Sequence, residues 1–226
     1  MKATTNREFF SEIYANKKWG GGEGQEKFYS GSGSHKEEII LPYINLLTQI
    51  IVNNNIRLIT DLGCGDFWIM RHVLGFLAEK NYNFFYNGVD VVEELIKYNS
   101  ETFNQPNIKF HCMDAAQDDA ELPSGELLII RQVLQHLSNA DIKKILDKAK
   151  SFKFLLITES IYDGADKIPN VDIAANRGTR GAFLSGVYPE HSPYNYKNIV
   201  HLLKLQGKNG AGDVIRSSLI INDVTL

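Results

Sequence analysis

Short apolar runs alternate with longer amphipathic stretches along the middle of the chain. The runs span six or seven residues, as buried strands do, and the stretches repeat apolar residues at steps of three and four, as helices do. The predicted strands are Arg57–Leu62, Phe84–Asp90, Ile108–Met113, Glu126–Arg131 and Phe152–Thr158. The predicted helices are His35–Asn53, Phe67–Ala78, Val92–Asn99 and Ala140–Lys150. Strands that alternate with helices predict βαβ units and a mostly parallel α/β sheet with helices on both faces.

The N-terminal residues 1–35 depart from this alternation. Four of their residues are spaced as one face of a short helix, namely Phe9, Phe10, Ile13 and Tyr14. The glycine-rich stretch that follows contains Trp19, which a plain linker does not need. We therefore predict that residues 1–35 form a helical lid, and that Ser34 caps the next helix with Glu37 as its capping-box partner.

The chain beyond the fifth predicted strand departs from the alternation as well. Residues 161–193 are rich in glycine, asparagine and proline, and a segment of this length without periodicity is typical of a binding loop. Residues 194–205 return to a helical pattern, and residues 213–222 read as a final strand. We predict an insert over 161–193, followed by a last helix. The residues after that helix have room for little more than one strand.

Composition narrows the class of protein. The chain has 226 residues, of which 43% are hydrophobic, and a formal net charge of −3. Such a balance gives no overall field for binding nucleic acid, and no apolar run reaches the ~20 residues of a membrane helix. The two cysteines cannot build a disulfide scaffold. We predict one cytoplasmic domain over 1–226 that needs neither nucleic acid nor membrane.

A glycine turn marks the candidate cofactor site. The sequence Asp61-Leu-Gly63-Cys64-Gly65 follows a predicted strand and opens a helix, which is where open α/β sheets hold nucleotide-type cofactors. Trp68 occupies the third glycine position of the dinucleotide motif, which argues against NAD and FAD. Two further acids lie at the ends of the next two predicted strands. Asp90 comes 29 residues after Asp61, and Asp114 comes 24 residues after Asp90.

Over residues 55–160 this order of motifs resembles that of the class I S-adenosylmethionine-dependent methyltransferases. The resemblance implies a doubly wound, Rossmann-like sheet and S-adenosylmethionine as the cofactor. Asp66 departs from the family pattern, because many relatives carry a third glycine there. The departure adds a negative charge beside the cofactor pocket.

The resemblance also suggests a role for each residue near the turn. Asp61 would bind the cofactor's ammonium group, the backbone of Gly63, Cys64 and Gly65 its methionyl part, and Asp90 with Val91 its ribose diol. Asp114 and the Ala115 N–H would bind the adenine, Arg131 would line the methionyl end, and Trp19 would close over the pocket. Simpler roles stay open: a helix cap for Asp90, a turn acid for Asp114, a structural ion pair for Arg131 and a small buried residue for Cys64.

The candidate general base is His136, directly after the fourth predicted strand. A hydroxyl acceptor benefits from a base, and the ordinary pKa of histidine suits that task, although in many family members this histidine is only structural. Five residues are candidates for binding the acceptor: Tyr14, Glu159, Arg177, Arg180 and His191. The two arginines could grip an anionic group of the acceptor or pair locally with Asp172. No compact cluster of His, Asp and Glu predicts a metal.

The sequence thus favours methyl transfer to a small polar acceptor, most simply a hydroxyl of a sugar or phosphorylated metabolite. Three alternatives stay open: an N-methyltransferase acting on an amine or protein, a non-catalytic S-adenosylmethionine-binding module, and an NAD-dependent oxidoreductase, which Trp68 disfavours. A homodimer is a further open expectation.

Overall fold

The computed structural model describes residues 5–21, 27–174, 178–207, 210 and 212–223. The chain forms two compact units, Met1–Asp114 and Ala115–Leu226. That the two belong to one domain stays a prediction.

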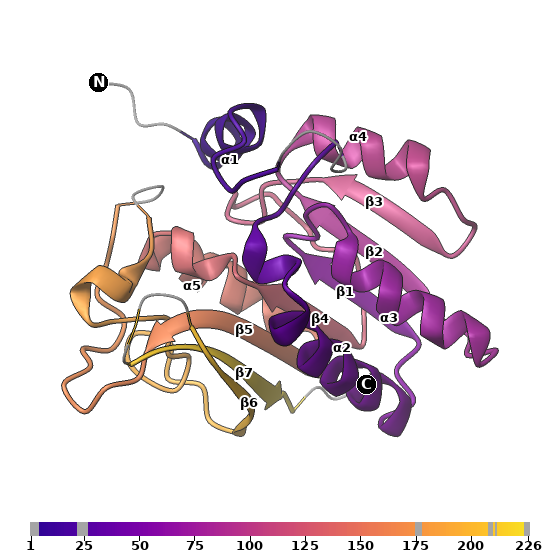
Figure 1. The fold of residues 1–226 in the computed structure, drawn as a ribbon. Helices are drawn as coiled ribbons and strands as arrows, with labels where there is room; N and C mark the ends of the chain where they lie inside the picture. The colour runs from indigo at the N-terminus through magenta and orange to yellow at the C-terminus, as the bar shows by residue number, and fades with distance from the viewer. Residues whose placement is uncertain (1–4, 22–26, 175–177, 208–209, 211, 224–226) are drawn as a thin grey trace. The chain divides into compact units, whose positions relative to one another are not determined.

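The first unit is a parallel α/β structure (Figure 1). Its helices are α1 (Asn6–Ala15), α2 (Glu37–Asn53), α3 (Trp68–Glu79) and α4 (Glu93–Thr102), with a short 3-10 turn at Ser32–Ser34. Its strands are β1 (Leu58–Leu62), β2 (Phe85–Asp90) and β3 (Ile108–Cys112). They lie in the order β3-β2-β1, and both pairs are parallel, as the alternating pattern predicts. Their carboxyl ends therefore share one edge, where Asp61, Asp90 and Asp114 are found.

The second unit mixes parallel and antiparallel pairing. It contains β4 (Leu127–Arg131), a 3-10 turn at Leu134–His136, α5 (Asn139–Ala149), β5 (Phe154–Tyr162), a second 3-10 turn at Arg180–Phe183, β6 (Ile199–Gln206) and β7 (Asp213–Ile221). The strand order is β4-β5-β7-β6, with β4 and β5 parallel and both pairs of β7 antiparallel. Most of residues 163–198 lie outside helices and strands, as the insert prediction requires.

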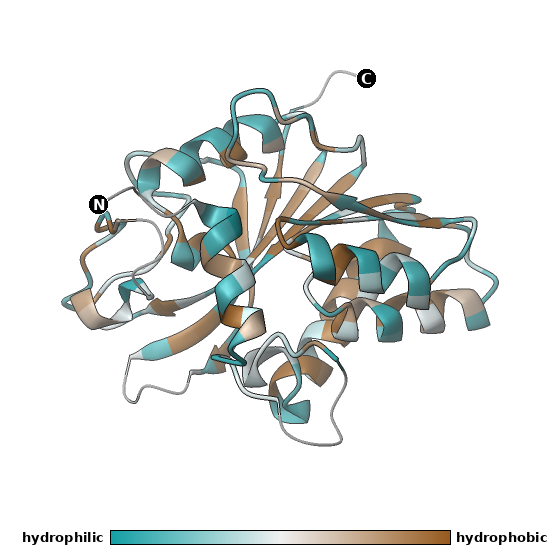
Figure 2. Ribbon diagram, turned by 90° about the horizontal axis from the view of Figure 1, so that it is seen from above, coloured by the Kyte–Doolittle hydropathy of each residue, from teal (hydrophilic) through white to brown (hydrophobic). Residues whose placement is uncertain are grey.

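The strands carry the apolar core, and the helices keep polar faces outward (Figure 2). In β4, Leu127, Leu128, Ile129 and Ile130 are fully or almost fully buried, so this strand has apolar neighbours on both faces. The helix α5 shows the usual local signals, because the Ser138 hydroxyl accepts a hydrogen bond from the Asp141 N–H and so caps the first turn. No described helix is long and apolar enough to cross a membrane.

Two sequence predictions are wrong at the level of elements. Residues 194–205 do not form a helix, because Ile199–Gln206 is the strand β6. A bulge between His201 and Leu203 inserts Leu202 into that strand, so the apolar residues lose their period of two and imitate helical spacing. The sheet consequently ends in two antiparallel strands where the sequence suggested room for little more than one.

The predicted cap of α2 is also wrong. Ser34 lies in the 3-10 turn before the helix, whose N-cap residue is Lys36 and has no side-chain cap hydrogen bond. The glutamates at the start of α2 still place negative charge at its N-terminus, where the helix dipole favours it.

Candidate active site

The glycine turn is held in place by the strand beside it. The N–H groups of Gly63 and Cys64 donate to the Val89 carbonyl oxygen, at 2.8 and 3.1 Å. Gly63 and Gly65 adopt φ angles of +78° and +54°, in the left-handed region that glycine tolerates best. At Gly65 a Cβ would also collide with the Ser30 side chain. The turn therefore needs glycine for its conformation and for close approach.

Asp90 fixes the turn from the end of β2. One carboxylate oxygen accepts the Gly65 N–H and the other accepts the Val92 N–H, each at 3.1 Å. Burial raises the pKa of this carboxyl, and the backbone hydrogen bonds oppose that rise. Asp90 thus couples the glycine turn to the start of α4 while lying at the strand end where the ribose is expected. The predicted role of Asp90 as the helix cap is wrong, because the N-cap residue of α4 is Val92. Its role as a ribose ligand stays a prediction that these hydrogen bonds permit, since each carboxylate oxygen has more than one lone pair.

Three buried carboxylates surround the turn. Asp61, Asp66 and Asp90 are all buried, and Asp61 accepts a 2.8 Å hydrogen bond from the Tyr86 hydroxyl. Burial, and then these three acids, raise the pKa of the Cys64 thiol well above its usual value. Cys64 is therefore a neutral, buried thiol, as its structural interpretation expects. A concentration of negative charge suits the sulfonium and ammonium groups of S-adenosylmethionine and would repel the pyrophosphate of NAD.

Asp66 does more than add charge, and sequence reasoning missed its role. Its Oδ2 accepts the Ser30 N–H at 2.6 Å and lies 2.7 Å from His35 Nε2. The Ser30 hydroxyl in turn accepts the Asp66 N–H at 2.9 Å and lies 2.8 Å from the Tyr14 hydroxyl. The residue that replaces the family's third glycine therefore attaches the N-terminal segment to the cofactor turn.

The N-terminal residues cover this edge with aromatic rings. Tyr14 packs edge-on against Trp19 and Phe28, with ring centroids 5.3 and 5.8 Å apart. Burial and the nearby Asp90 and Asp66 carboxylates raise the pKa of the Tyr14 hydroxyl well above its usual value. Tyr14, predicted to bind the acceptor, therefore lies at the cofactor turn instead.

Asp114 and Val91 lie at the same edge. The Asn6 side-chain amide of α1 is 3.4 Å from both Asp114 carboxylate oxygens. Val91 packs against the small apolar cluster of Phe28, Val92 and Leu95. The structure thus brings together the acids predicted for the ammonium, ribose and adenine of the cofactor.

Asn99 is another residue that sequence reasoning missed. It is fully buried on α4, and its amide donates to the Gly65 carbonyl oxygen at 2.8 Å. A polar residue on the apolar face of an amphipathic helix is the signal that could have revealed it.

In the second unit, His136 lies in the 3-10 turn that follows β4. The Ser160 N–H donates to Gln135 Oε1 at 3.0 Å, which turns the Gln135 amide nitrogen toward His136 Nε2, 3.2 Å away. His136 Nδ1 lies 3.3 Å from the Gly178 carbonyl oxygen, which can only accept. These partners assign the ring proton to Nδ1 and the lone pair to Nε2, where it accepts the Gln135 amide N–H. Burial, together with the Arg180 charge, lowers the pKa of His136 to about 4, so the ring is neutral at physiological pH.

Glu159 and Arg180 do not match their predicted roles as acceptor ligands. Glu159, in β5, is buried, and its carboxylate accepts three backbone N–H groups. Arg180 is 1% exposed, and all five of its N–H donors are used within this unit. Because these bonds use all of its donors, the structure favours the structural role for Arg180 over the anion-binding role that was its alternative. Arg177 lies outside the described residues.

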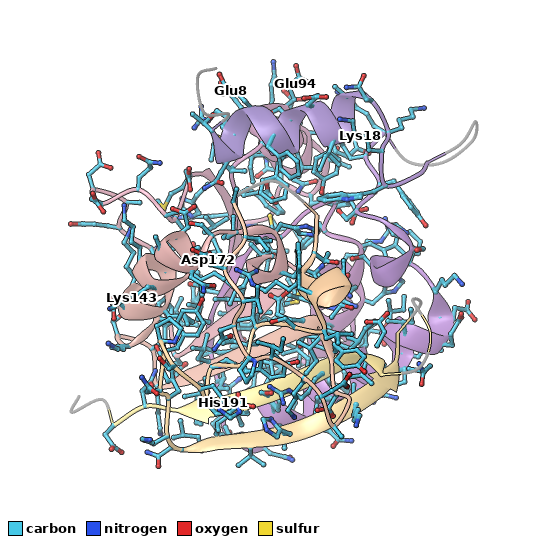
Figure 3. All side chains as sticks on the ribbon, turned by 90° about the vertical axis from the view of Figure 1, so that its left-hand side faces the viewer. Glu8, Lys18, Glu94, Lys143, Asp172 and His191 are labelled. Atoms are coloured by element: carbon cyan, nitrogen blue, oxygen red, sulfur yellow. The ribbon has the colours of Figure 1, made fainter. Side chains whose placement is uncertain are left out.

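The other candidates of this unit are dispersed. Arg131 ends β4 and is half-buried, Ala115 is buried at the start of the unit, and His191 is exposed in a turn (Figure 3). Asp172 accepts the Asn139 N–H at 2.8 Å. The described residues contain no group of three or more His, Cys, Asp or Glu side chains that could hold a metal ion.

Asn170 organises the insert. It is buried, and its amide donates to the Tyr188 and Ser192 carbonyl oxygens, both at 2.9 Å, and accepts the Tyr188 N–H at 2.8 Å. The polar groups that the sequence suggested for an acceptor are thus partly used to shape the insert itself.

Comparison with known proteins agrees with this geometry. Residues 59–152 match a family model described as a methyltransferase domain. Comparison with curated protein sequences gives no match. Among solved structures, the N-methyltransferase NodS from Bradyrhizobium japonicum WM9 in complex with S-adenosyl-L-homocysteine is similar, with a TM-score of 0.59, 12% identity, and coverage of 85% of this chain and 91% of that one.

Two further structures cover almost the whole chain. One is magnesium protoporphyrin IX methyltransferase from Synechocystis PCC 6803 with bound S-adenosylmethionine, with a TM-score of 0.56, 12% identity, and coverage of 98% of this chain and 100% of that one. The other is the N-terminal domain of EvdMO1 in the presence of S-adenosyl-L-homocysteine and D-fucose, with a TM-score of 0.56, 12% identity, and coverage of 98% of this chain and 99% of that one. These similarities confirm the α/β, Rossmann-like fold. The domain match identifies residues 59–152 as a methyltransferase domain, whose cofactor is S-adenosylmethionine.

Proposed function

We propose that the protein transfers a methyl group to a hydroxyl of a small polar acceptor, such as a sugar, with His136 as the general base. The observation that carries the proposal is the state of this ring. Its neighbours keep it neutral, with the proton on Nδ1 and the lone pair on Nε2. A ring in this state is ready to accept a proton.

S-adenosylmethionine, when bound, supplies an electrophilic methyl group on its sulfonium. Asp61, Asp90 and Asp114 would hold the cofactor's ammonium, ribose and adenine, in that order. The protein's remaining task is to place the acceptor oxygen in line with the methyl group and to take up its proton. The acceptor oxygen would gain the methyl group as the bond between that carbon and the sulfonium sulfur breaks, which leaves the neutral thioether S-adenosyl-L-homocysteine, and the O–H proton would pass to His136 Nε2.

A low pKa for His136 does not prevent this step. A hydroxyl oxygen that has gained a methyl group and still carries its proton is a strong acid, so even a weak base accepts that proton downhill. The low pKa also keeps the lone pair available over a wide pH range. The acceptor hydroxyl must compete for that lone pair with the Gln135 amide, which is 3.2 Å away.

The choice of a sugar hydroxyl has limited support from the similar structures. The EvdMO1 domain was crystallised in the presence of D-fucose, whereas NodS is an N-methyltransferase. A phosphorylated acceptor has lost one predicted ligand, because Arg180 has no free donor. We therefore favour an uncharged polyol over a phosphate ester.

The proposal is tested by offering the protein methyl-labelled S-adenosylmethionine with three panels: free sugars and polyols, the matching sugar phosphates, and primary and secondary amines. We expect label in an ether of the first panel. Label found only in amines would overturn the proposal in favour of an N-methyltransferase. Tight cofactor binding with no transfer to any panel would favour the non-catalytic binding module.

A further inference from the structure

Two buried residues of opposite charge contact the turn that carries His136. From the first side comes Glu159 of β5, which is 1% exposed. Its Oε1 accepts the N–H groups of Val133 and Leu134, at 3.2 and 3.0 Å, and its Oε2 accepts the N–H of Gln135 at 3.2 Å. Three successive backbone donors thus point at a single carboxylate.

Arg180 contacts the same turn through its carbonyl groups. This side chain is also 1% exposed, and it reaches the turn from the insert. Its Nη1 donates to the Leu134 and Gln135 carbonyl oxygens, both at 3.2 Å, and its Nη2 donates to the Leu137 carbonyl oxygen at 2.6 Å. The remaining donors go to the Val171 carbonyl oxygen and Asn139 Oδ1, both at 2.9 Å.

The two charges match the polarity of the peptide groups that they meet. The Glu159 carboxylate accepts backbone N–H groups, and the Arg180 guanidinium donates to backbone carbonyl groups. Leu134 and Gln135 are therefore held through both their N–H and their carbonyl groups. Charge-assisted hydrogen bonds of this kind are about twice as strong as neutral ones. A turn fixed in this way leaves the Gln135 and His136 side chains little freedom to change place.

We infer that Glu159 and Arg180 are positioning residues for His136: from opposite sides they hold the turn so that the ring keeps its proton on Nδ1 and its lone pair on Nε2. That this positioning serves catalysis rests on the proposed function. That the two residues hold the turn rests on the hydrogen bonds alone. Neither residue touches the reacting atoms.

Conservative substitutions break the arrangement without removing bulk. In Glu159→Gln an amide nitrogen replaces one carboxylate oxygen and faces a backbone N–H. In Arg180→Lys one ammonium with three donors replaces a fork with five and cannot span the same carbonyl groups. Glu190→Gln is the matched control, because it disrupts the Glu190–Arg216 pair of the same unit, at 2.9 Å, without touching the turn.

The experiment follows His136 by nitrogen NMR in the full chain labelled on histidine, with the signal assigned by its loss in His136→Gln. We expect the wild type and Glu190→Gln to show a neutral ring protonated on Nδ1 that titrates near pH 4. At pH 8, where the Glu159 carboxyl is ionised, we expect Glu159→Gln and Arg180→Lys to show a mixture of the two neutral forms of the His136 ring. With an acceptor found in the panels above, kcat should fall by roughly 10-fold or more while KM and cofactor affinity stay within about twofold.

An unchanged ring, protonated on Nδ1 alone at pH 8 in both folded variants, would overturn the inference, whatever the turnover. If Arg180→Lys fails to fold, Glu159→Gln decides alone. The proposed function fails separately, if His136→Gln keeps normal turnover while the NMR signature responds as expected.

Discussion

Asp90 is the residue on which the proposed cofactor site depends most. Its carboxylate holds the N–H groups of Gly65 and Val92 and lies where the ribose diol is expected. We expect Asp90→Ala to weaken S-adenosylmethionine binding by about 1.5–3 kcal/mol, which is roughly 10- to 150-fold in Kd, because charge-assisted hydrogen bonds are lost. Calorimetric titration measures this change.

Glu94→Ala is the control for that titration. Glu94 lies nearby on α4 but points away from the protein (Figure 3), so its removal changes the charge equally and should leave the affinity unchanged. Equal affinity of folded Asp90→Ala and wild type would remove the ribose assignment.

Glu159 should leave a signature in the pH dependence of stability. Burial raises its pKa from 4.5 to about 7, so between these values the folded state holds a proton that the unfolded state has lost. Stability must then fall as pH rises across this window, by at most about 3 kcal/mol at 1.36 kcal/mol per unit. His136 acts in the opposite sense between about pH 4 and 6.5, because its pKa is lowered.

The Glu159→Gln variant separates the two contributions, since His136 is present in both proteins. We expect the stability of the variant relative to wild type to rise between pH 5 and 7, as measured by urea unfolding at each pH. Parallel curves for the two proteins would show that the carboxyl titrates at an ordinary pH.

At the scale of elements, the N-terminal segment is joined to the cofactor turn through Asp66. We expect Asp66→Gly, which restores the residue common in the family, to release the Ser30 N–H and the His35 ring. Hydrogen exchange of the amides between residues 28 and 36 should quicken by about 10-fold or more, as a loss of 1.4 kcal/mol or more in local stability implies. Mass spectrometry of peptides from this region measures the change.

Glu12→Gln serves as the control, because it removes only the exposed Glu12–Lys18 pair, whose atoms are 2.6 Å apart. Its exchange should match wild type. Wild-type protection of residues 28–36 in Asp66→Gly would mean that aromatic packing alone holds the segment.

Elements with a regular period could be predicted from the sequence, and elements with a local irregularity could not. The parallel strands and α5 follow the apolar pattern closely, because burial on both faces of a strand, or on one face of a helix, repeats with a fixed period. The strand β6 has the apolar spacing of a helix in the sequence, because the bulge at Leu202 breaks its period of two. The start of α2 was misread because the segment before it forms a 3-10 turn through Ser34.

At the scale of the whole molecule, the same distinction separates the acids of the first unit from the turn that carries His136 in the second. The acids of the candidate cofactor site could be placed from the sequence because each lies at or close to the carboxyl end of a strand, so local sequence positions it. The role of Arg180 could not, because its partners in the turn and in α5 lie 41 to 46 positions earlier in the chain. An arginine between a glycine and a threonine looks the same in a sequence whether it is exposed or buried.

The central claim is that a fixed, neutral His136 accepts the proton of a hydroxyl acceptor. The most direct measurement compares turnover of wild type and His136→Ala at saturating S-adenosylmethionine on the hydroxyl acceptor found by the panels, with cofactor affinity measured in parallel. The account predicts a loss of about 10²- to 10⁴-fold in kcat with nearly unchanged cofactor binding, the range expected when a general base is removed. Near-normal turnover of folded His136→Ala on that acceptor would contradict it.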